Sequence, residues 1–385
     1  MNILADENMP LAKVLFEKFG NVTLKHGRKI TADDLIDIDV LLVRSITKVN
    51  KDLLSKANKL KFVGTATAGF DHIDTKALEE KGIAFSNAQG CNKISVGEYV
   101  LSSLLLLQQM FNLDFSKLTM AVIGAGCTGS EVIRRAKALG LNLLISDPPL
   151  KEEDSPKYSN YVNFKECLNA DIISFHVPLI KDGSHPTYHM LNKELFEKYY
   201  KNGEKFIINA SRGEVIDDLA LNEALDKNPN LHLIKDVWEE EPSIKCKELI
   251  KKAIITTPHI AGYSYEGKCR GTFMLYEKLC QMENVKPIDF KTLLKKPQIS
   301  EITIDEELNL DIIRRLVHLI YDVRRDSNTF RLNFNGGESF DALRKNYLER
   351  RELSSLLVNS SPKNSQILKD LGFSVKELLW FFLNF

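Results

Sequence analysis

Three polar segments supply side chains that can bind an anion and move a proton. Arg212 stands in Asn-Ala-Ser-Arg-Gly, Glu241 stands directly before a proline, and His259 stands in Pro-His-Ile-Ala-Gly. A guanidinium binds a carboxylate through two parallel hydrogen bonds, and an imidazole transfers protons near neutral pH. A carboxylate beside the imidazole fixes its tautomer and favours its charged form. We therefore expect acid–base chemistry, with Glu241 preferred over Glu239 and Glu240 because of its register with the proline.

Each member of this set also has an ordinary structural interpretation. Arg212 could form a surface ion pair, and His259 could be a core histidine with satisfied hydrogen bonds. For His176, His185 and His189, a loop or structural role is the better expectation. The geometry of the folded chain decides between these alternatives.

A glycine-rich segment has the spacing of a dinucleotide-binding turn. Gly124, Gly126 and Gly129 form Gly-x-Gly-x-x-Gly between an apolar strand pattern and a helical pattern. The first glycine allows a tight turn, the second lets a pyrophosphate approach the backbone, and the third lets helix and strand pack closely. The phosphates then meet the N–H groups at the start of the helix. This segment predicts a cofactor site that also includes Cys127 and Thr128.

Asp147 ends the next expected strand after the glycine turn. A carboxylate at this position accepts hydrogen bonds from the adenosine ribose and repels the additional phosphate of NADP. The alternative is a loop acid that precedes two prolines. We expect the cofactor to be NAD.

Strand patterns alternate with helical patterns in two separate series, and the long helix expected over residues 95–111 connects them. Such alternation predicts parallel sheets with helices on both faces. The fold class is therefore α/β with two doubly wound parallel-sheet domains. The expected strands cover residues 2–5, 40–43, 61–64, 83–85, 120–123, 142–146, 172–175, 206–209, 233–237 and 254–257, and the other expected helices cover residues 10–19, 74–81 and 130–139.

The pattern changes after about residue 287. Helices are expected over residues 309–323 and 343–356, and short strands over residues 301–304 and 329–334. These segments predict a third, smaller α+β domain of about 100 residues, within the usual size range of domains.

The composition excludes several classes of protein. Lys plus Arg number 52 and Asp plus Glu number 52, so the formal net charge is zero, which argues against nucleic-acid binding through overall positive charge. The longest apolar run, residues 100–107, contains two serines and is shorter than a membrane span requires. The first residues do not resemble a signal peptide, and the six cysteines have no metal-site spacing. We expect a cytoplasmic protein with reduced thiols and no bound metal.

The ordered motifs resemble the D-isomer-specific 2-hydroxyacid dehydrogenases. The glycine turn, residues 176–179 (His-Val-Pro-Leu), Asn-Ala-Ser-Arg-Gly, Asp-Val-Trp-x-x-Glu-Pro and Pro-His-Ile-Ala-Gly follow each other as in that family, over residues 40–285. The resemblance implies that Arg212 binds the substrate carboxylate and that His259, paired with Glu241, takes the hydroxyl proton as hydride leaves for NAD. It also implies further cofactor contacts by Val177, Ser211, Asp236 and Gly262, although some relatives have Thr at the position of Val177.

The resemblance implies a domain organisation as well. A flavodoxin-like substrate-binding domain would comprise residues 1–94 and 259–286, and a Rossmann NAD-binding domain residues 95–258. Residues 287–385 would form the small α+β domain through which two chains form a homodimer.

Finer features resemble the branch of this family that oxidises 4-phospho-D-erythronate to 2-oxo-3-hydroxy-4-phosphobutanoate in the synthesis of pyridoxal 5′-phosphate (vitamin B6). They include residues 5–10, 43–49, 64–69, 90–92 and 259–268 and much of the tail. That resemblance implies substrate contacts by Ser45, Thr67 and Tyr263. For the substrate phosphate, Arg44 and the tail arginines Arg350 and Arg351 are open alternatives, beside structural roles such as a solvated charged helix in the tail.

Two other functions remain as alternatives. One is a different D-2-hydroxyacid dehydrogenase, of the phosphoglycerate or hydroxypyruvate type. The other is an NAD-sensing binding protein on the same scaffold, because one fold supports many functions.

Overall fold

The computed structural model describes residues 1–378 and divides into two compact units. The first unit contains residues 1–92 and 264–296, and the second contains residues 93–263 and the chain from residue 297 onward. The assignment of segments to substrate-binding, NAD-binding and dimerisation domains stays a prediction. Residues 379–385, which end the expected C-terminal domain, lie outside the described residues.

The first unit is built on a five-stranded parallel sheet in the order β2-β1-β3-β4-β5, which is the flavodoxin order. The apolar runs predicted β1, β3, β4 and β5 but not β2. Strand β2 lies at the edge of the sheet and is largely exposed, so no continuous apolar run identifies it. The elements of this unit are β1 (Asn2–Asp6), α1 (Ala12–Phe16), β2 (Asn21–Lys25), β3 (Val40–Val43), β4 (Phe62–Thr65), α2 (Thr75–Glu80), β5 (Ala84–Asn87) and α10 (Tyr265–Met282).

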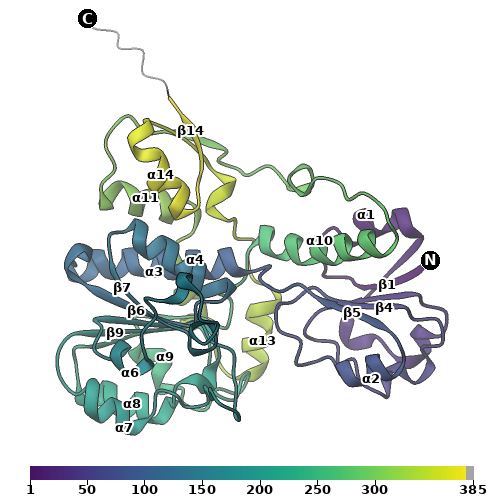
Figure 1. The fold of residues 1–385 in the computed structure, drawn as a ribbon, viewed down its shortest axis with the longest axis horizontal. Coiled ribbons are helices and arrows are strands. Elements are labelled where there is room, and N and C mark those ends of the chain that lie inside the picture. Colours follow the sequence, from purple (N-terminus) through teal and green to yellow (C-terminus); the bar gives the residue numbers. More distant parts are fainter. Residues whose placement is uncertain (379–385) are drawn as a thin grey trace, which may run out of the picture. The chain divides into compact units, whose positions relative to one another are not determined.

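The second unit contains a six-stranded parallel sheet in the order β11-β10-β9-β8-β6-β7. Strand β6 has β7 on one side and β8 on the other, so the order reverses at the end of β6, where α/β sheets bind ligands. Figure 1 shows α3 and α4 on one face of this sheet and α6, α8 and α9 on the other. The elements are α3 (Lys93–Phe111), β6 (Thr119–Ile123), α4 (Cys127–Ala138), β7 (Asn142–Ser146), α5 (Pro148–Lys151), α6 (Phe164–Cys167), β8 (Ile172–Phe175), α7 (Lys193–Tyr199), β9 (Lys205–Asn209), α8 (Asp218–Lys227), β10 (Leu231–Lys235), α9 (Glu248–Lys252) and β11 (Ile255–Thr256).

Helix α3 is the core helix of the second unit. Within the described residues it alone is long and apolar enough to cross a membrane, but 72% of that window is buried inside the protein, as in a core helix. Its polar Ser102 is buried and has partners: Oγ donates to the Tyr321 carbonyl at 3.0 Å and accepts from the Val323 N–H at 3.1 Å. Gly97 lets α4 approach, because a Cβ there would lie 2.9 Å from Nη1 of Arg135.

The C-terminal segment adds a three-stranded parallel sheet in the order β12-β13-β14. Helix α11 packs against α3, and α14 packs against α4. This segment therefore belongs to the second compact unit. Its elements are β12 (Glu301–Thr303), α11 (Leu310–Ile320), α12 (Val323–Asn333), α13 (Gly337–Lys345), β13 (Leu357–Ser360), α14 (Pro362–Leu371) and β14 (Ser374–Glu377).

Two predictions for the tail were wrong. The strand expected over residues 329–334 falls within α12, whose buried residues Val323, Ser327 and Phe330 have helical rather than alternating spacing. The helix expected over residues 343–356 ends with α13 at Lys345, and the following residues are not helical before the short 3-10 turn Leu353–Ser355.

Arg350 shows why this stretch leaves the helical conformation. The side chain is buried, and its guanidinium carbon lies 3.5 Å from the ring centroid of Tyr321. Nη2 donates to the Ser95 carbonyl at 2.6 Å and lies 3.6 Å from Oε2 of Glu98, while Nη1 donates to the Ala261 carbonyl at 3.2 Å. Arg350 therefore neither lies on a solvated helix nor is exposed for phosphate binding, so both expectations for this residue were wrong.

We predict that Arg350→Ala strongly destabilises the protein, because it leaves the carbonyls of Ser95 and Ala261 without the guanidinium that binds them in the protein interior. A buried acceptor that loses its partner costs about 1–3 kcal/mol. Urea unfolding followed by circular dichroism measures the change. Arg315→Ala is the matched control, since that side chain is 77% exposed and its loss should change the free energy of unfolding by less than about 0.5 kcal/mol. Equal unfolding curves for the two variants would contradict the assigned role.

Candidate functional site

The three polar segments expected to do chemistry follow three neighbouring strands of the second sheet. Arg212 follows β9, Glu241 follows β10, and His259 follows β11, and these strands are adjacent and parallel. Their carboxyl ends therefore lie at the same edge of the sheet, where open α/β sheets bind ligands.

His259 and Glu241 form a hydrogen-bonded pair. Nδ1 of His259 lies 2.7 Å from Oε2 of Glu241, and the other carboxylate oxygen accepts the Trp238 N–H at 2.9 Å. Burial opposes ionisation of Glu241, but the charge of His259 and these hydrogen bonds, with a further contribution from Arg344, lower its pKa below the ordinary value. The His259 side chain is about one-third exposed. Its Nε2 therefore remains available for proton transfer.

The neighbouring glutamates have other environments. Glu239 is buried and pairs with Nε2 of His189 and with Nζ of Lys245, the latter at 2.8 Å. Glu240 is exposed. Of the three consecutive acids, Glu241 is the one that reaches His259, as the register with the proline predicted.

Asp236 holds the turn that carries His259. Its buried carboxylate accepts the Thr257 hydroxyl at 2.6 Å, the Ile260 N–H at 2.8 Å and the Ala261 N–H at 2.9 Å. The Asp236 carbonyl accepts the His259 N–H at 2.7 Å. His259 has a φ of +55°, a left-handed conformation that is uncommon outside glycine. Burial raises the pKa of Asp236, and the charge of His259 together with these donors opposes the shift.

A compact turn presents Arg212. Oδ1 of Asn209 accepts both the N–H and the hydroxyl of Ser211, at 3.1 and 2.9 Å, and its amide donates to the Arg212 carbonyl at 3.1 Å. A Cβ on Gly213 would lie 1.9 Å from the Trp238 carbonyl oxygen, so only glycine lets this turn lie against the turn that follows β10.

The guanidinium of Arg212 is half-buried. Its Nη1 donates to the Ser211 carbonyl at 2.8 Å. Within residues 1–378 we find no carboxylate in an ion pair with Arg212, so the surface ion-pair alternative has no support. Nη2 and Nε remain able to bind an acidic ligand.

The glycine turn has the geometry that its sequence predicted. Gly124 has a φ of +88°, and a Cβ there would lie 2.7 Å from the His176 carbonyl oxygen. A Cβ on Gly129 would lie 1.8 Å from the Gly124 carbonyl oxygen, which shows how closely helix and turn pack. By contrast, a Cβ on Gly126 would meet no atom within 4 Å. The open space above Gly126, at the N-cap of α4, fits a pyrophosphate.

Two other expected cofactor residues, Asp147 and Val177, contact this turn. Asp147 accepts the Ala125 N–H at 2.7 Å through Oδ2 and caps α5 through Oδ1, so it has structural partners as well as partial exposure. Val177 lies next to Gly124. The structure places the remaining ones as follows: Cys127 is exposed, Thr128 and Gly262 are half-buried, and Ser211 is buried.

His176 has a structural environment, as expected. It is buried, and its Nε2 lies 2.8 Å from the Ser174 hydroxyl. Burial lowers the pKa of His176 to about 3. It therefore stays neutral and takes no part in acid–base chemistry near neutral pH.

The expected substrate residues Arg44, Ser45 and Thr67 lie in the first unit, after the adjacent strands β3 and β4. Nε of Arg44 lies 3.6 Å from Oδ2 of the buried Asp6, which supports a structural role for this arginine. Thr67 donates to the Gly69 carbonyl at 2.8 Å, and Ser45 is exposed.

Tyr263 lies in the second unit. Its ring packs edge-on against Tyr347, with centroids 5.7 Å apart. The guanidinium carbon of Arg344 lies 5.9 Å from the Tyr263 centroid. Arg344 lies in a tail segment that carries the family resemblance, but the sequence indicates no role in the site for it, because it reaches this position only through folding.

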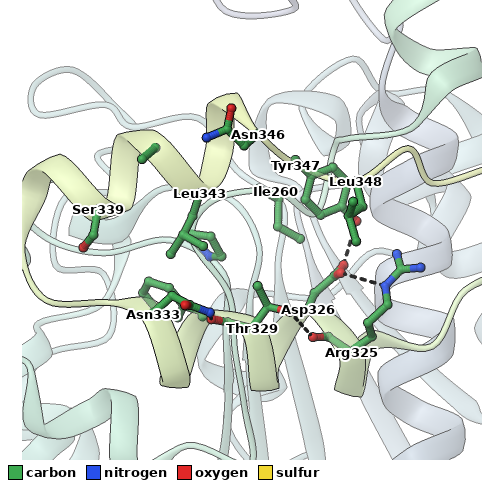
Figure 2. Close-up of a pocket in the computed structure, with 13 residues that line it drawn as sticks. Ile260, Arg325, Asp326, Thr329, Asn333, Ser339, Leu343, Asn346, Tyr347 and Leu348 are labelled. Atoms are coloured by element: carbon green, nitrogen blue, oxygen red, sulfur yellow. Dashed lines mark hydrogen bonds and ion pairs between the residues drawn. The ribbon is translucent and has the colours of Figure 1, made fainter.

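A cavity of about 230 Å³ lies between α12 and α13, behind the turn that carries His259. Figure 2 shows Asp326 in its wall, bonded to Arg325 and to Tyr347. Pro258 and Ile260 complete the wall, whereas His259 itself is not part of it. The cavity therefore borders the two neighbours of His259 but neither His259 nor Glu241. Among residues 1–378 no cluster of His, Cys, Asp and Glu that could hold a metal is found.

Comparisons with known proteins agree with this geometry. Residues 102–261 match the family described as D-isomer specific 2-hydroxyacid dehydrogenase, NAD binding domain, and residues 293–372 match a domain of unknown function (DUF3410). The chain is 47% identical to the erythronate-4-phosphate dehydrogenase of Tolumonas auensis, over 97% of this chain and 99% of that protein.

Solved structures resemble a part of the chain. The D-lactate dehydrogenase of Aquifex aeolicus, in complex with NAD and lactic acid, has a TM-score of 0.53 at 25% identity and covers 74% of this chain and 96% of its own. The NAD-bound 3-phosphoglycerate dehydrogenase of Entamoeba histolytica has a TM-score of 0.60 at 22% identity and covers 74% and 95%.

We predict that Gly129→Ala impairs folding, whereas Gly126→Ala impairs cofactor binding alone. Gly129→Ala forces a backbone collision and should cost about 3 kcal/mol or more of stability. Gly126→Ala adds a methyl group to open space, so the unfolding midpoint should stay unchanged while NADH affinity falls at least about tenfold. Thermal unfolding and NADH fluorescence titration measure the two effects. An unchanged NADH affinity in Gly126→Ala would show that the pyrophosphate binds elsewhere.

Proposed function

The chain belongs to the erythronate-4-phosphate dehydrogenase family of D-isomer specific 2-hydroxyacid dehydrogenases, and from this we propose that it oxidises 4-phospho-D-erythronate to 2-oxo-3-hydroxy-4-phosphobutanoate. It is an NAD-dependent 2-hydroxyacid dehydrogenase. The observation that carries the proposal is the hydrogen bond of 2.7 Å between His259 and Glu241, beside the turn of Arg212.

His259 takes the proton of the substrate hydroxyl. Because Nδ1 is bonded to Glu241, Nε2 is the atom that receives the proton as the C2–O bond becomes a carbonyl. The C2 hydrogen leaves with its electron pair as hydride, which the nicotinamide of NAD accepts. One proton and one hydride leave the substrate, so the reaction is balanced.

Glu241 stabilises the imidazolium that this step produces. Its lowered pKa keeps the carboxylate charged at neutral pH. A hydrogen bond to a charged group contributes about 1.5–3 kcal/mol. Asp236 acts indirectly, because its hydrogen bonds to the backbone of His259 and Ile260 hold the turn in which His259 contacts Glu241. We also propose that it contacts the nicotinamide amide.

Arg212 binds the carboxylate of the substrate and orients C2. A planar guanidinium can donate two parallel hydrogen bonds to the two oxygens of a carboxylate, which a lysine ammonium cannot do. Ser45, Thr67 and Tyr263 complete the proposed substrate contacts, with Arg44 as a further contact. Asp147 binds the adenosine ribose, and the proposed cofactor contacts are Gly124, Gly126, Cys127, Thr128, Gly129, Val177, Ser211 and Gly262.

We further propose that two chains form a homodimer through residues 287–385 and that the enzyme acts in the cytoplasm, in pyridoxal 5′-phosphate synthesis. The exposed apolar residues Leu319, Leu332 and Leu348 of the tail support an interface. The cysteines of the described chain are free thiols, which suits a reducing compartment. Light scattering of the full chain tests the dimer, and a monomer at working concentration would contradict it.

The proposed activity is tested by NADH absorbance with NAD and 4-phospho-D-erythronate, beside 3-phosphoglycerate and D-glycerate. A carbonyl-trapping reagent draws the oxidation forward. We expect kcat/KM for the phosphoerythronate to exceed that for either control at least about 100-fold, the discrimination that paired polar contacts provide. Preference for 3-phosphoglycerate would indicate another dehydrogenase of the family. NAD binding without turnover of any of the three would favour the NAD-sensing alternative.

We predict that His259→Ala lowers kcat by about 10²- to 10⁴-fold, the usual contribution of a general base, and leaves NADH affinity unchanged. His185→Ala is the matched control, because His185 pairs with the exposed Glu152 and lies outside the site. Single-turnover absorbance measures the chemical step. A rate equal to that of the control variant would refute the role of His259.

A further inference from the structure

Arg344 is a positively charged side chain that α13 brings to the site from the tail of the chain. Its guanidinium carbon lies 5.9 Å from the centroid of Tyr263 and 5.8 Å from that of Phe340. Its Nε is buried and has no hydrogen-bond partner. A side-chain hydrogen bond with Tyr263 also holds the guanidinium, so Nε is the donor that has no partner within the described residues.

The surroundings of Arg344 connect it with the acid–base pair. Burial works against its charged form, but the interaction with Tyr263, which includes a hydrogen bond, and the charges of Glu241 and Asp236 outweigh this effect and raise its pKa. In return, Arg344 helps to lower the pKa of Glu241. Arg344 therefore lies within electrostatic reach of the residues that hold and activate His259.

Arg344 is partly exposed, but its Nε is buried without a partner, and such a donor is costly unless an anion pairs with it. Every 2-hydroxy acid has a carboxylate, and Arg212 is the residue proposed to bind that group. A 4-phosphorylated substrate has a second anion, two carbons beyond the reacting C2, and needs a second cation.

The sequence offered Arg44, Arg350 and Arg351 for this role. Nε of Arg44 lies 3.6 Å from a carboxylate oxygen of Asp6, and Arg350 binds buried carbonyls. Arg351 stays an alternative.

The position of Arg344 in the chain agrees with such a role. It lies outside residues 102–261, which match the NAD-binding domain common to the 2-hydroxyacid dehydrogenases, and inside residues 293–372, which match a separate domain. A residue that recognises a group peculiar to one substrate is expected in a segment that is not part of the shared cofactor domain.

We propose that Arg344, beside Tyr263, forms the subsite for the substrate phosphate. This inference rests on the proposed function, since it assumes a phosphorylated hydroxy acid. A guanidinium binds phosphate through two parallel hydrogen bonds, and the aromatic rings around it keep the fork oriented. The C-terminal segment would then determine substrate specificity through Arg344, in addition to packing against α3 and α4.

The test compares two substrates that differ only in the phosphate, 4-phospho-D-erythronate and D-erythronate. The variants are Arg344→Met, which removes the charge at similar length, and Arg344→Lys, which keeps the charge without the fork. Lys345→Met is the matched control, because Lys345 is the neighbouring, exposed cation on the same helix. NADH affinity and the unfolding midpoint establish that each variant is folded.

We expect Arg344→Met to lower kcat/KM for the phosphorylated substrate about 10- to 100-fold, mainly through KM, the range for a lost charge-assisted hydrogen bond. The value for D-erythronate should change less than about twofold. Arg344→Lys should recover part of the loss, and Lys345→Met should resemble the wild type. An equal loss on both substrates, with a shifted pH profile, would overturn the proposal and assign Arg344 to support of Glu241. A phosphate-specific loss in Arg44→Met alone would also overturn it.

Binding of inorganic phosphate to the NADH complex, measured by calorimetry, separates this inference from the proposed function. Binding to the wild type that Arg344→Met abolishes supports the subsite, even if the wild type does not oxidise 4-phospho-D-erythronate and the proposed function fails. Oxidation of 4-phospho-D-erythronate by the wild type, with equal phosphate binding in the two proteins, overturns the subsite and leaves the function intact.

Discussion

The buried carboxylate of Asp236 is the interaction on which the active geometry depends. It accepts one hydroxyl and two backbone N–H groups from residues 257–261, and these donors compensate for removing the carboxylate from water. The donors also hold the turn in which His259 has a positive φ, a conformation uncommon for residues other than glycine. In this conformation Nδ1 of His259 lies 2.7 Å from Glu241, so a buried anion supports the turn on which the pair depends.

Close backbone contacts then join the separate loops into one structure. Gly213 lets the turn of Arg212 lie directly against the Trp238 carbonyl, and the N–H of Trp238 holds Glu241. The groups expected to bind the carboxylate and to accept the proton are therefore connected by backbone rather than by flexible side chains. Such preorganisation reduces the rearrangement needed during reaction.

The tail also takes part in this arrangement. Arg350 binds the Ala261 carbonyl, next to the turn of His259, and stacks on Tyr321. Residues 329–334 show the limit of short-range patterns here. Their apolar residues suggested a strand, yet Phe330 completes a helical stripe that begins seven residues earlier, at Val323, so a six-residue window could not distinguish the two.

The sequence alone determined the candidate site: the glycine turn, Arg212, Glu241 and His259, their order, and the apolar strands that place them at one sheet edge. These features depend on residue type and near neighbours along the chain, which a sequence displays directly. Only the tertiary structure decided which side chains meet. The structure shows that Asp236 binds the Ala261 N–H, that Arg350 binds the Ser95 carbonyl and that Arg344 lies beside Tyr263. These contacts join residues distant in the chain, and they arise only once helices and strands have packed.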